Sequence, residues 1–427
     1  MIIGIVIGSG IFFKTDDILR DTNGNVALGA VALVVGAIGI VFGGLSLSKL
    51  AAKSDNAGGL ITYCEMVTNK FFAFICGYFQ MVCYFPALIA IVSYVAANYT
   101  LILFPQWNLN IWMVTLFYLM MIFIMNFVSA KMAGHFQNTS TIIKMIPLFV
   151  IGCIGLFFGN PEAIQNDALS IPLMITSSSA IVSVAFSYDG WTIAPSICHE
   201  IKNAKRNLPL ALCISPLIIM GIYLIYFIGM SSILGADHII AVGDAHVSEV
   251  ATMYFGSFGN KLIMTTIIIS VLGSANGLTL GGIRIPYALA LRKELPYAEK
   301  IAYVNTKFKM PSISVLILFI FTLLWLGVHA LALNISLFSH IDISAIPIVI
   351  MYLFYTIIFI SIIALYIRKQ LTGFFRSVIC SLLACLGSLV IIYGALNSSM
   401  SLTYITISFI ILLSGVIIHL FKNKTLK

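Results

Sequence analysis

Charged residues are scarce in this chain: they make up 9% of its 427 residues, whereas soluble globular proteins carry about 25%. Hydrophobic residues reach 60%, and mean hydropathy is +1.07. So few charges cannot cover a soluble surface, which excludes a cytosolic enzyme. Apolar runs broken by Gly and Pro also exclude disorder and coiled coil. The remaining class is an all-α polytopic membrane protein embedded in the lipid bilayer. In a membrane protein, the net charge of +8 matters through the positions of the basic residues relative to the bilayer. No nucleic-acid partner is expected.

Motifs for metal or redox chemistry are also absent, because the sequence holds neither CxxC nor HExxH. The eight cysteines lie in or beside apolar runs or near segment ends, without a ligand partner at short spacing. We expect free thiols, no metal site and no cofactor. The seven histidines lie mostly in loops or near helix ends and form no nucleophile–base pair. This argues against a membrane-embedded enzyme.

Long apolar runs dominate instead, and about twenty apolar residues cross a bilayer as one helix. Twelve runs qualify as candidate spans, the first of them short: 1–13, 26–48, 71–101, 109–130, 139–159, 172–197, 210–233, 261–289, 312–332, 343–367, 374–396 and 402–421. Segment 53–70 is short and of mixed polarity, which favours an interfacial helix or a re-entrant piece.

The basic residues indicate the orientation of these spans, since Lys and Arg gather in cytoplasmic loops. Most of them fall in one set of alternate loops, and only Lys14, Arg20 and Lys261 fall in the other; Lys144 and Arg284 lie within spans. The asymmetry holds loop by loop with twelve spans. It predicts a multi-pass protein of the cytoplasmic (inner) membrane with both termini in the cytoplasm.

Two spans contain sequences that interrupt a helix. The first reads MIIGIVIGSGIFF, and the sixth has SYDGW at its centre, with Asp189 at mid-membrane. Interrupted helices at matching places in two halves point to a transporter binding site. Their separation of five spans predicts two inverted repeats, 1–159 and 172–369, followed by a segment 374–427 with the last two helices.

Where the first helix resumes, the backbone amides of Ser9, Gly10 and Ile11 have no partner within the helix. Such amides at a helix start favour a carboxylate, and glycine lets the backbone approach closely. The alternative is that Gly-Ser-Gly only allows close helix packing. The second break at the matching place favours the binding interpretation.

Carbonyl groups that end the preceding half-helix suit an ammonium group. Those near Val6 and Ile7 belong to the first break, and a second set near Phe186 and Ser187 belongs to the sixth span. Amides for a carboxylate and carbonyls for an ammonium together predict a site for a zwitterion, that is, an α-amino acid.

The interrupted segments and three further motifs resemble one known family. GIVIGSGIFF at 4–13, AFSYDGW at 185–191 and EIKNAKRNLPLAL at 200–212 are similar to the L-type amino-acid transporters of the amino acid–polyamine–organocation superfamily. GGLITYCEMV at 58–67 and GSANGLTLGGIRIPYALA at 273–290 resemble the same group. The resemblance covers nearly the whole chain and is strongest to bacterial exchangers of small neutral amino acids, such as serine/threonine or alanine/serine/cysteine exchangers. It implies a LeuT-type fold with broken helices 1 and 6 and sodium-independent exchange.

The resemblance also implies roles for single residues. The substrate carboxylate would meet the Ser9 and Gly10 amides, and its ammonium the Val6, Phe186 and Asp189 carbonyls. Phe186 would close the external side of the site as an aromatic lid. The loop 102–108 lacks the cysteine through which animal members bind a single-span partner, so no disulfide-linked heavy chain is expected. Relatives also carry a longer first half-helix: seven residues before Gly8 give only about 10 Å of helix.

Two polar residues within spans keep alternative interpretations. The resemblance places Lys144 near the first-helix break, where sodium-coupled members of the fold bind an ion; otherwise it snorkels to the nearby interface. Asn276 either bonds the substrate or caps a kink. The function predicted is sodium-independent exchange of small neutral L-amino acids by alternating access. The alternative is a proton-coupled amino-acid or amine uptake permease, which Asp189 would support. A receptor that binds substrate without moving it is a further possibility.

Overall fold

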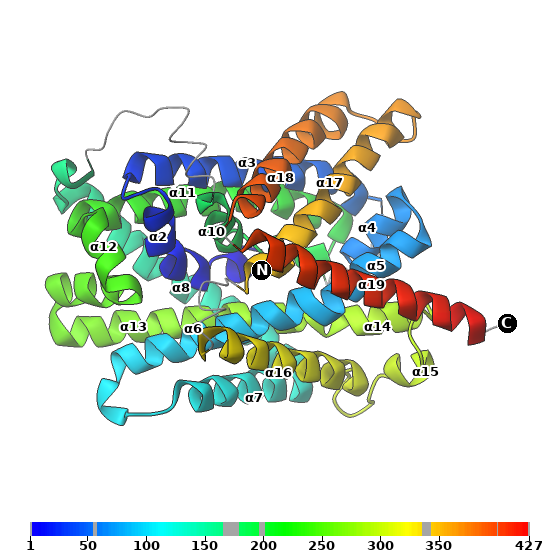
Figure 1. Cartoon of the computed structure of the whole chain (residues 1–427), viewed down its shortest axis with the longest axis horizontal. Helices are drawn as coiled ribbons and strands as arrows, with labels where there is room; N and C mark the ends of the chain where they lie inside the picture. Colours follow the sequence, from blue (N-terminus) through cyan, green and yellow to red (C-terminus); the bar gives the residue numbers. More distant parts are fainter. Residues whose placement is uncertain are drawn as a thin grey trace.

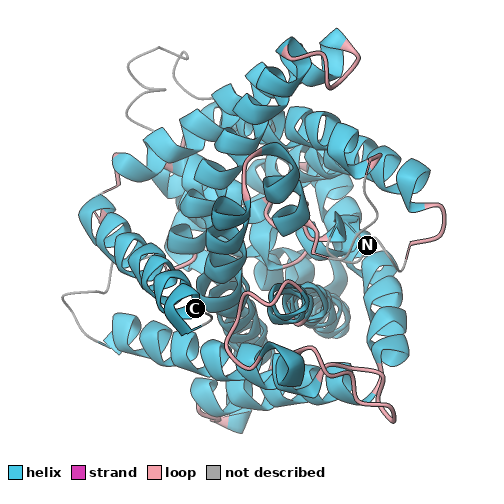
Figure 2. Cartoon of the chain, turned by 90° about the vertical axis from the view of Figure 1, so that its right-hand side faces the viewer, coloured by secondary structure: helices cyan, strands magenta, loops and turns pink. Residues whose placement is uncertain are grey.

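A computed structural model of the chain describes residues 2–53, 58–164, 179–195, 201–334, 343–398 and 400–425. These residues form helices joined by turns and include no strand; one isolated bridge pairs Asn305 with Met310. Most long helices run side by side along the long axis of the molecule (Figure 1), and the view from one end shows them gathered around a central group (Figure 2). The prediction of an all-α protein is confirmed.

Ten helical stretches are long and apolar enough to cross a membrane. They are α3 (Val26–Ala51), α5–η1–α6 (Lys70–Leu103), α7 (Ile111–Val128), most of α8 (Ala130–Phe158), α11 (Ala204–Leu234), α12–α14 (Ala236–Leu291), α16 (Ser312–Asn334), α17 (Ala345–Ile367), η7–α18 (Phe375–Leu396) and most of α19 (Ser401–Thr425). The expected first and sixth spans are not among them: the first is divided into α1 and α2, and the described part of the sixth contains the short helix α10. Residues 172–178 and 196–197 of the sixth span lie outside the described residues, so the count of twelve stays a prediction.

The remaining described elements are short helices and turns, together with the helices that make up the composite stretches above; α13 among them is kinked at Gly256. They are α1 (Ile2–Val6), α2 (Ser9–Asp21), α4 (Leu60–Val67), α5 (Lys70–Phe79), the π-helical turn η1 (Gln80–Tyr84), α6 (Phe85–Leu103), η2 (Pro105–Trp107), η3 (Pro161–Ile164), α10 (Ala180–Ser187), α12 (Ala236–Val242), η5 (Gly243–Ala245), α13 (His246–Gly282), α14 (Arg284–Leu291), α15 (Ala298–Ile301), the π-helical turn η7 (Phe375–Ile379) and α18 (Cys380–Leu396). α4 lies within segment 53–70, for which an interfacial helix or a re-entrant piece stays a prediction.

The outer surface of the bundle is apolar. Ile142, Phe157 and Phe258 expose 71%, 81% and 81% of their surface. A water-soluble protein does not display such side chains over most of its helices, whereas the acyl chains of a bilayer accommodate them. The exposed side chains therefore agree with a multi-pass membrane protein.

The interrupted helices lie in the middle of the bundle. α1 packs against α8, α11 and α13, while α10 packs against α2, α3, α17 and α18 (Figure 1). Long neighbouring helices thus surround the short ones. This packing removes water and lipid from the broken backbone, where unpaired polar groups can be kept for a ligand.

Candidate functional site

The first break separates α1 from α2 at Ile7 and Gly8. Gly8 has φ −158° and ψ −120°, outside both the helical and the extended regions, and no side chain caps the start of α2. The amides of Ser9, Gly10 and Ile11 therefore begin a helix without a side-chain acceptor, as the sequence predicted. The side chain of Ser9 lies outside the described part, so only its backbone enters the argument.

The second break begins where α10 ends at Ser187, and turns follow through residues 188–195. Gly190 has φ +93°, a left-handed conformation that glycine adopts without steric cost. The two breaks approach each other closely: a Cβ added at Gly10 would lie 2.5 Å from Ser187 Cα and 2.9 Å from Ser187 O. The close contact between the backbones of α2 and α10 thus requires a glycine at position 10.

Tyr223, which the sequence did not identify, contacts the backbone of both breaks. The Tyr223 hydroxyl, on α11, lies 3.0 Å from Val6 O and 2.8 Å from Ser187 O, so it bridges the two carbonyls. Ser274 Oγ, on α13, lies 3.4 Å from Ile7 O. The Tyr223 hydroxyl has one proton to share between the Val6 and Ser187 carbonyls, so these oxygens keep lone pairs that can accept from an ammonium group.

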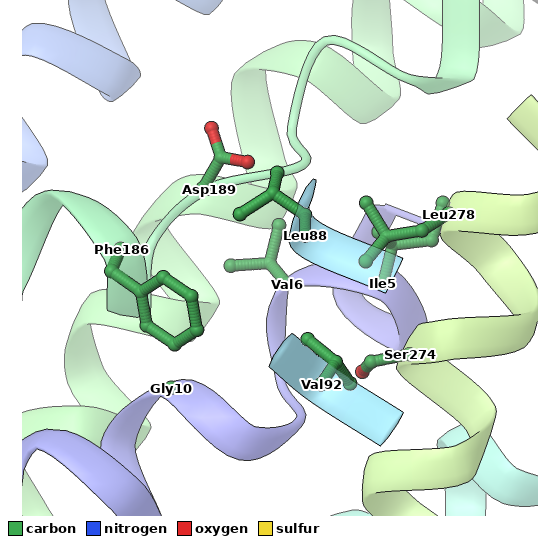
Figure 3. A pocket seen from close by; sticks show the side chains of 9 residues that line it. All are labelled: Ile5, Val6, Gly10, Leu88, Val92, Phe186, Asp189, Ser274 and Leu278. Carbon is green, nitrogen blue, oxygen red and sulfur yellow. The ribbon is translucent and has the colours of Figure 1, made fainter. Parts of the chain in front are cut away.

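A small cavity lies between the breaks (Figure 3). Its lining residues are Ile5, Val6, Gly10, Leu88, Val92, Phe186, Asp189, Ser274 and Leu278. Its volume of about 30 Å³ is room for about two water molecules. An amino acid needs more space, so the lining must move apart when one binds. Leu88 and Val92 of α6 and Leu278 of α13 give the cavity an aliphatic wall, which the Ser274 hydroxyl of α13 interrupts.

Asp189 supplies the acidic side chain in this lining. One of its carboxylate oxygens, Oδ2, accepts a hydrogen bond of 2.7 Å from the Tyr84 hydroxyl. The other, Oδ1, is buried and has no hydrogen-bond partner within the described ranges. Tyr84 ends the π-helical turn η1, and such turns often occur at functional sites. No sequence pattern marks Tyr84, because its role depends on the helix that faces it.

Lys144 lies fully buried beside the first break. Its Nζ donates to Gly4 O at 2.6 Å and to Ser274 Oγ at 3.2 Å. Gln137 Nε2 also donates to Gly4 O, at 2.8 Å. The side chain does not snorkel to the interface, so this alternative from the sequence is wrong. The lysine joins α8, α1 and α13 next to the cavity.

Asn276 is not among the residues that line the cavity. Its side-chain amide donates to Ala133 O and Gln137 Oε1, and its Oδ1 accepts from Asn126. These bonds join α13 to α7 and α8, and they occupy the polar atoms of the side chain. The geometry therefore gives Asn276 an interhelical contact, and neither a place in the cavity nor a cap on a kink. Among the other predicted residues, Ile7, Ile11 and Ser187 flank the cavity without lining it.

Phe186, which lines the cavity, packs against an aromatic ring and a cation from α2. The Phe186 ring lies 6.4 Å from that of Phe13, in an edge-on arrangement. Lys14 Nζ lies 5.0 Å from the Phe13 centroid and 5.5 Å from that of Phe186, and it donates to Asp17 at 2.9 Å. Cation–π contacts of this kind stabilise the packing. Lys14 was counted in the sequence only as a loop charge.

Two interrupted helices that meet at a buried cavity, inside a multi-pass helical bundle, are typical of a membrane transporter. The chain belongs to the amino acid permease family, whose model matches residues 1–421. It is therefore a transporter and not an enzyme, as the sequence predicted.

Three relatives illustrate the range of the family. The chain is 32% identical over 377 residues to the serine/threonine exchanger SteT of Bacillus subtilis (strain 168), covering 87% of this chain and 82% of the relative. It is 24% identical over 326 residues to the human cystine/glutamate transporter, covering 74% and 64%. It is 22% identical over 327 residues to the human b(0,+)-type amino acid transporter 1, covering 73% and 65%. All three are amino-acid transporters by name.

Proposed function

We propose that this protein exchanges small neutral L-amino acids across the cytoplasmic membrane without sodium, by alternating access. The observation that carries the proposal is the meeting of the two breaks. The amides at the start of α2 have no side-chain cap and can bind the substrate carboxylate. The carbonyls of Val6 and Ser187 lie close enough to share one hydroxyl. The similarity to a serine/threonine exchanger supports a substrate with a small side chain, as do the aliphatic walls of the narrow cavity.

Independence from sodium is supported by Lys144. Its nitrogen already donates to the Gly4 carbonyl and to Ser274, which are oxygen atoms of the kind that a sodium ion would need as ligands. In the proposed cycle, the repeats 1–159 and 172–369 move relative to each other around the cavity. Both termini remain on the cytoplasmic side, and no disulfide-linked heavy chain takes part.

Uptake of labelled serine into proteoliposomes tests this function. We expect uptake when the vesicles contain unlabelled serine, and only background uptake when they are empty, because an exchanger changes sides only with substrate bound. A sodium gradient should leave the rate unchanged. Uptake into empty vesicles at the loaded rate would contradict exchange, and stimulation by sodium would contradict the role given to Lys144.

A second candidate function, proton-coupled uptake, is favoured by one observation: the buried Asp189 carboxyl group lines the cavity. Asp189→Asn separates the two functions, because asparagine keeps an acceptor for Tyr84 but cannot carry a proton in the same way. For an exchanger we expect the variant to keep serine exchange within about fivefold of the wild type, the cost of one altered hydrogen bond.

The matched measurement applies an inward proton gradient to empty vesicles. An exchanger should show no accumulation in either protein. Accumulation by the wild type that is lost in Asp189→Asn would establish proton coupling and replace the first proposal.

A further inference from the structure

A second, larger hollow lies away from the breaks, between α7 and α16. Its lining residues are Met120, Phe123, Ile124, Phe127, Ser312, Val315, Leu316 and Phe319. We call it the α7–α16 groove. Its volume is about 300 Å³, ten times that of the cavity at the breaks. The two helices lie next to each other along one edge of the bundle in Figure 1.

The groove opens towards the membrane. Its rim residues Met120, Ile124 and Leu316 are 47%, 56% and 54% exposed, whereas Phe123 and Val315 at its floor are buried. Because the chain is a multi-pass membrane protein, acyl chains surround this face of the bundle. A concave apolar wall of this size fits an acyl chain better than it fits a water-soluble ligand.

One polar atom interrupts the apolar lining. Ser312 Oγ is buried, and within the part of the chain that the structure describes it has no hydrogen-bond partner. Leaving a buried hydroxyl unpaired costs about 1–3 kcal/mol. Ser312 is the first residue of α16, so it marks the end of the groove near the membrane surface. Glycerol and ester oxygens of a phospholipid lie at this depth and would accept its hydrogen bond.

Basic residues gather at the same end of the groove. The Phe127 ring packs 4.9 Å from that of Phe308, and Lys307 Nζ lies 5.4 Å from the Phe308 centroid. Lys309 precedes Ser312 by three residues, and Lys131 follows Phe127 by four. Segments 119–134 and 303–319 contain no Asp or Glu. The charges on these two segments are therefore positive and complement an anionic headgroup, while the neighbouring α15 adds one acidic and one basic residue, Glu299 and Lys300.

We propose that the α7–α16 groove binds one anionic phospholipid. An acyl chain lies along Phe123, Val315 and Phe319, the glycerol region meets Ser312, and the phosphate faces Lys307 and Lys309, with Lys131 beside them. The charge distribution of the loops places this headgroup in the cytoplasmic leaflet. The proposal does not depend on the substrate that the transporter carries.

Native mass spectrometry of the detergent-purified protein tests this site with two lipids of identical acyl chains. Phosphatidylglycerol is anionic, and phosphatidylcholine has no net charge. We expect the wild type to retain one phosphatidylglycerol under conditions that remove phosphatidylcholine. Lys307→Gln combined with Lys309→Gln should weaken retention on the order of 25-fold, since each lysine near an anionic lipid contributes about fivefold. Leu316→Trp, which fills the groove, should also remove the lipid.

Matched controls use another groove and other lysines. Leu353, 41% exposed, lines an apolar groove between α17, α18 and α19 that has no basic residue in its lining. Leu353→Trp should leave phosphatidylglycerol bound. Lys202→Gln combined with Lys369→Gln should also leave phosphatidylglycerol bound. This variant removes two exposed lysines on the same predicted side of the membrane. Equal retention of both lipids by the wild type would overturn the proposal, as would equal loss in the control variants.

Discussion

Gly10→Ala is expected to reduce amino-acid exchange at least about 100-fold, the cost of displacing a binding group by about 1 Å in other active sites. The added Cβ would lie 2.5 Å from Ser187 Cα and 2.9 Å from Ser187 O, well inside the usual carbon contact distance of about 3.5–4.0 Å. Both atoms are backbone, so no side-chain rotation relieves the clash. α2 and α10 must therefore separate, and the carboxylate-binding amides move away from the second break. Exchange of labelled serine in proteoliposomes measures the effect.

Gly221→Ala provides the matched control. Gly221 lies within α11, and a Cβ added there would meet no atom within 4 Å. Alanine favours a helix over glycine by about 1 kcal/mol, so this variant should exchange serine normally and be at least as stable as the wild type. Size-exclusion chromatography should show both variants folded and monodisperse. Normal exchange by folded Gly10→Ala would refute the close approach of the breaks as a requirement for transport.

The backbone of the site was largely predictable from the sequence, because broken transmembrane helices leave a local signal. Gly-Ser-Gly and Tyr-Asp-Gly-Trp interrupt apolar runs, and the structure ends α1 and α10 at these places. Asp189 was also predictable, since an acidic residue at mid-membrane needs a polar environment. Its side chain lines the cavity.

The side chains contributed by other helices were not predictable. Tyr84 and Tyr223 belong to the 18 tyrosines of the chain, and nothing local distinguishes them. Their importance depends on which carbonyl or carboxylate faces them after the helices have packed. Asn276, in contrast, was selected from the sequence as a substrate contact because it is a polar residue near the predicted site. Three amide side chains, those of Asn126, Gln137 and Asn276, instead bond one another between helices, a common way to satisfy polar groups within the membrane.

Lys144→Met is expected to lower serine exchange about 10- to 100-fold. Methionine keeps most of the length of the lysine stem, so the packing of α8 changes little, but both hydrogen bonds from Nζ to Gly4 O and Ser274 Oγ disappear. Losing a buried hydrogen-bond partner costs about 1–3 kcal/mol. Gly4 O still accepts a hydrogen bond from Gln137. We therefore expect α1 to stay in contact with α8 and α13, but with fewer hydrogen bonds holding it in place. Initial rates of serine exchange at several substrate concentrations measure the loss.

Two comparisons separate a role in transport from a role in folding. Lys202→Met removes an exposed lysine and should leave exchange unchanged. A thermal unfolding midpoint of Lys144→Met close to that of the wild type, together with a reduced exchange rate, would show that the lysine positions the first break for transport. Unchanged exchange in Lys144→Met would exclude this role.

If exchange by the variant became dependent on sodium, that result would support the proposed link between the lysine and the absence of a sodium requirement. The physical reason is direct: removing the amine from Gly4 O and Ser274 Oγ leaves oxygen ligands that a cation from solution could occupy.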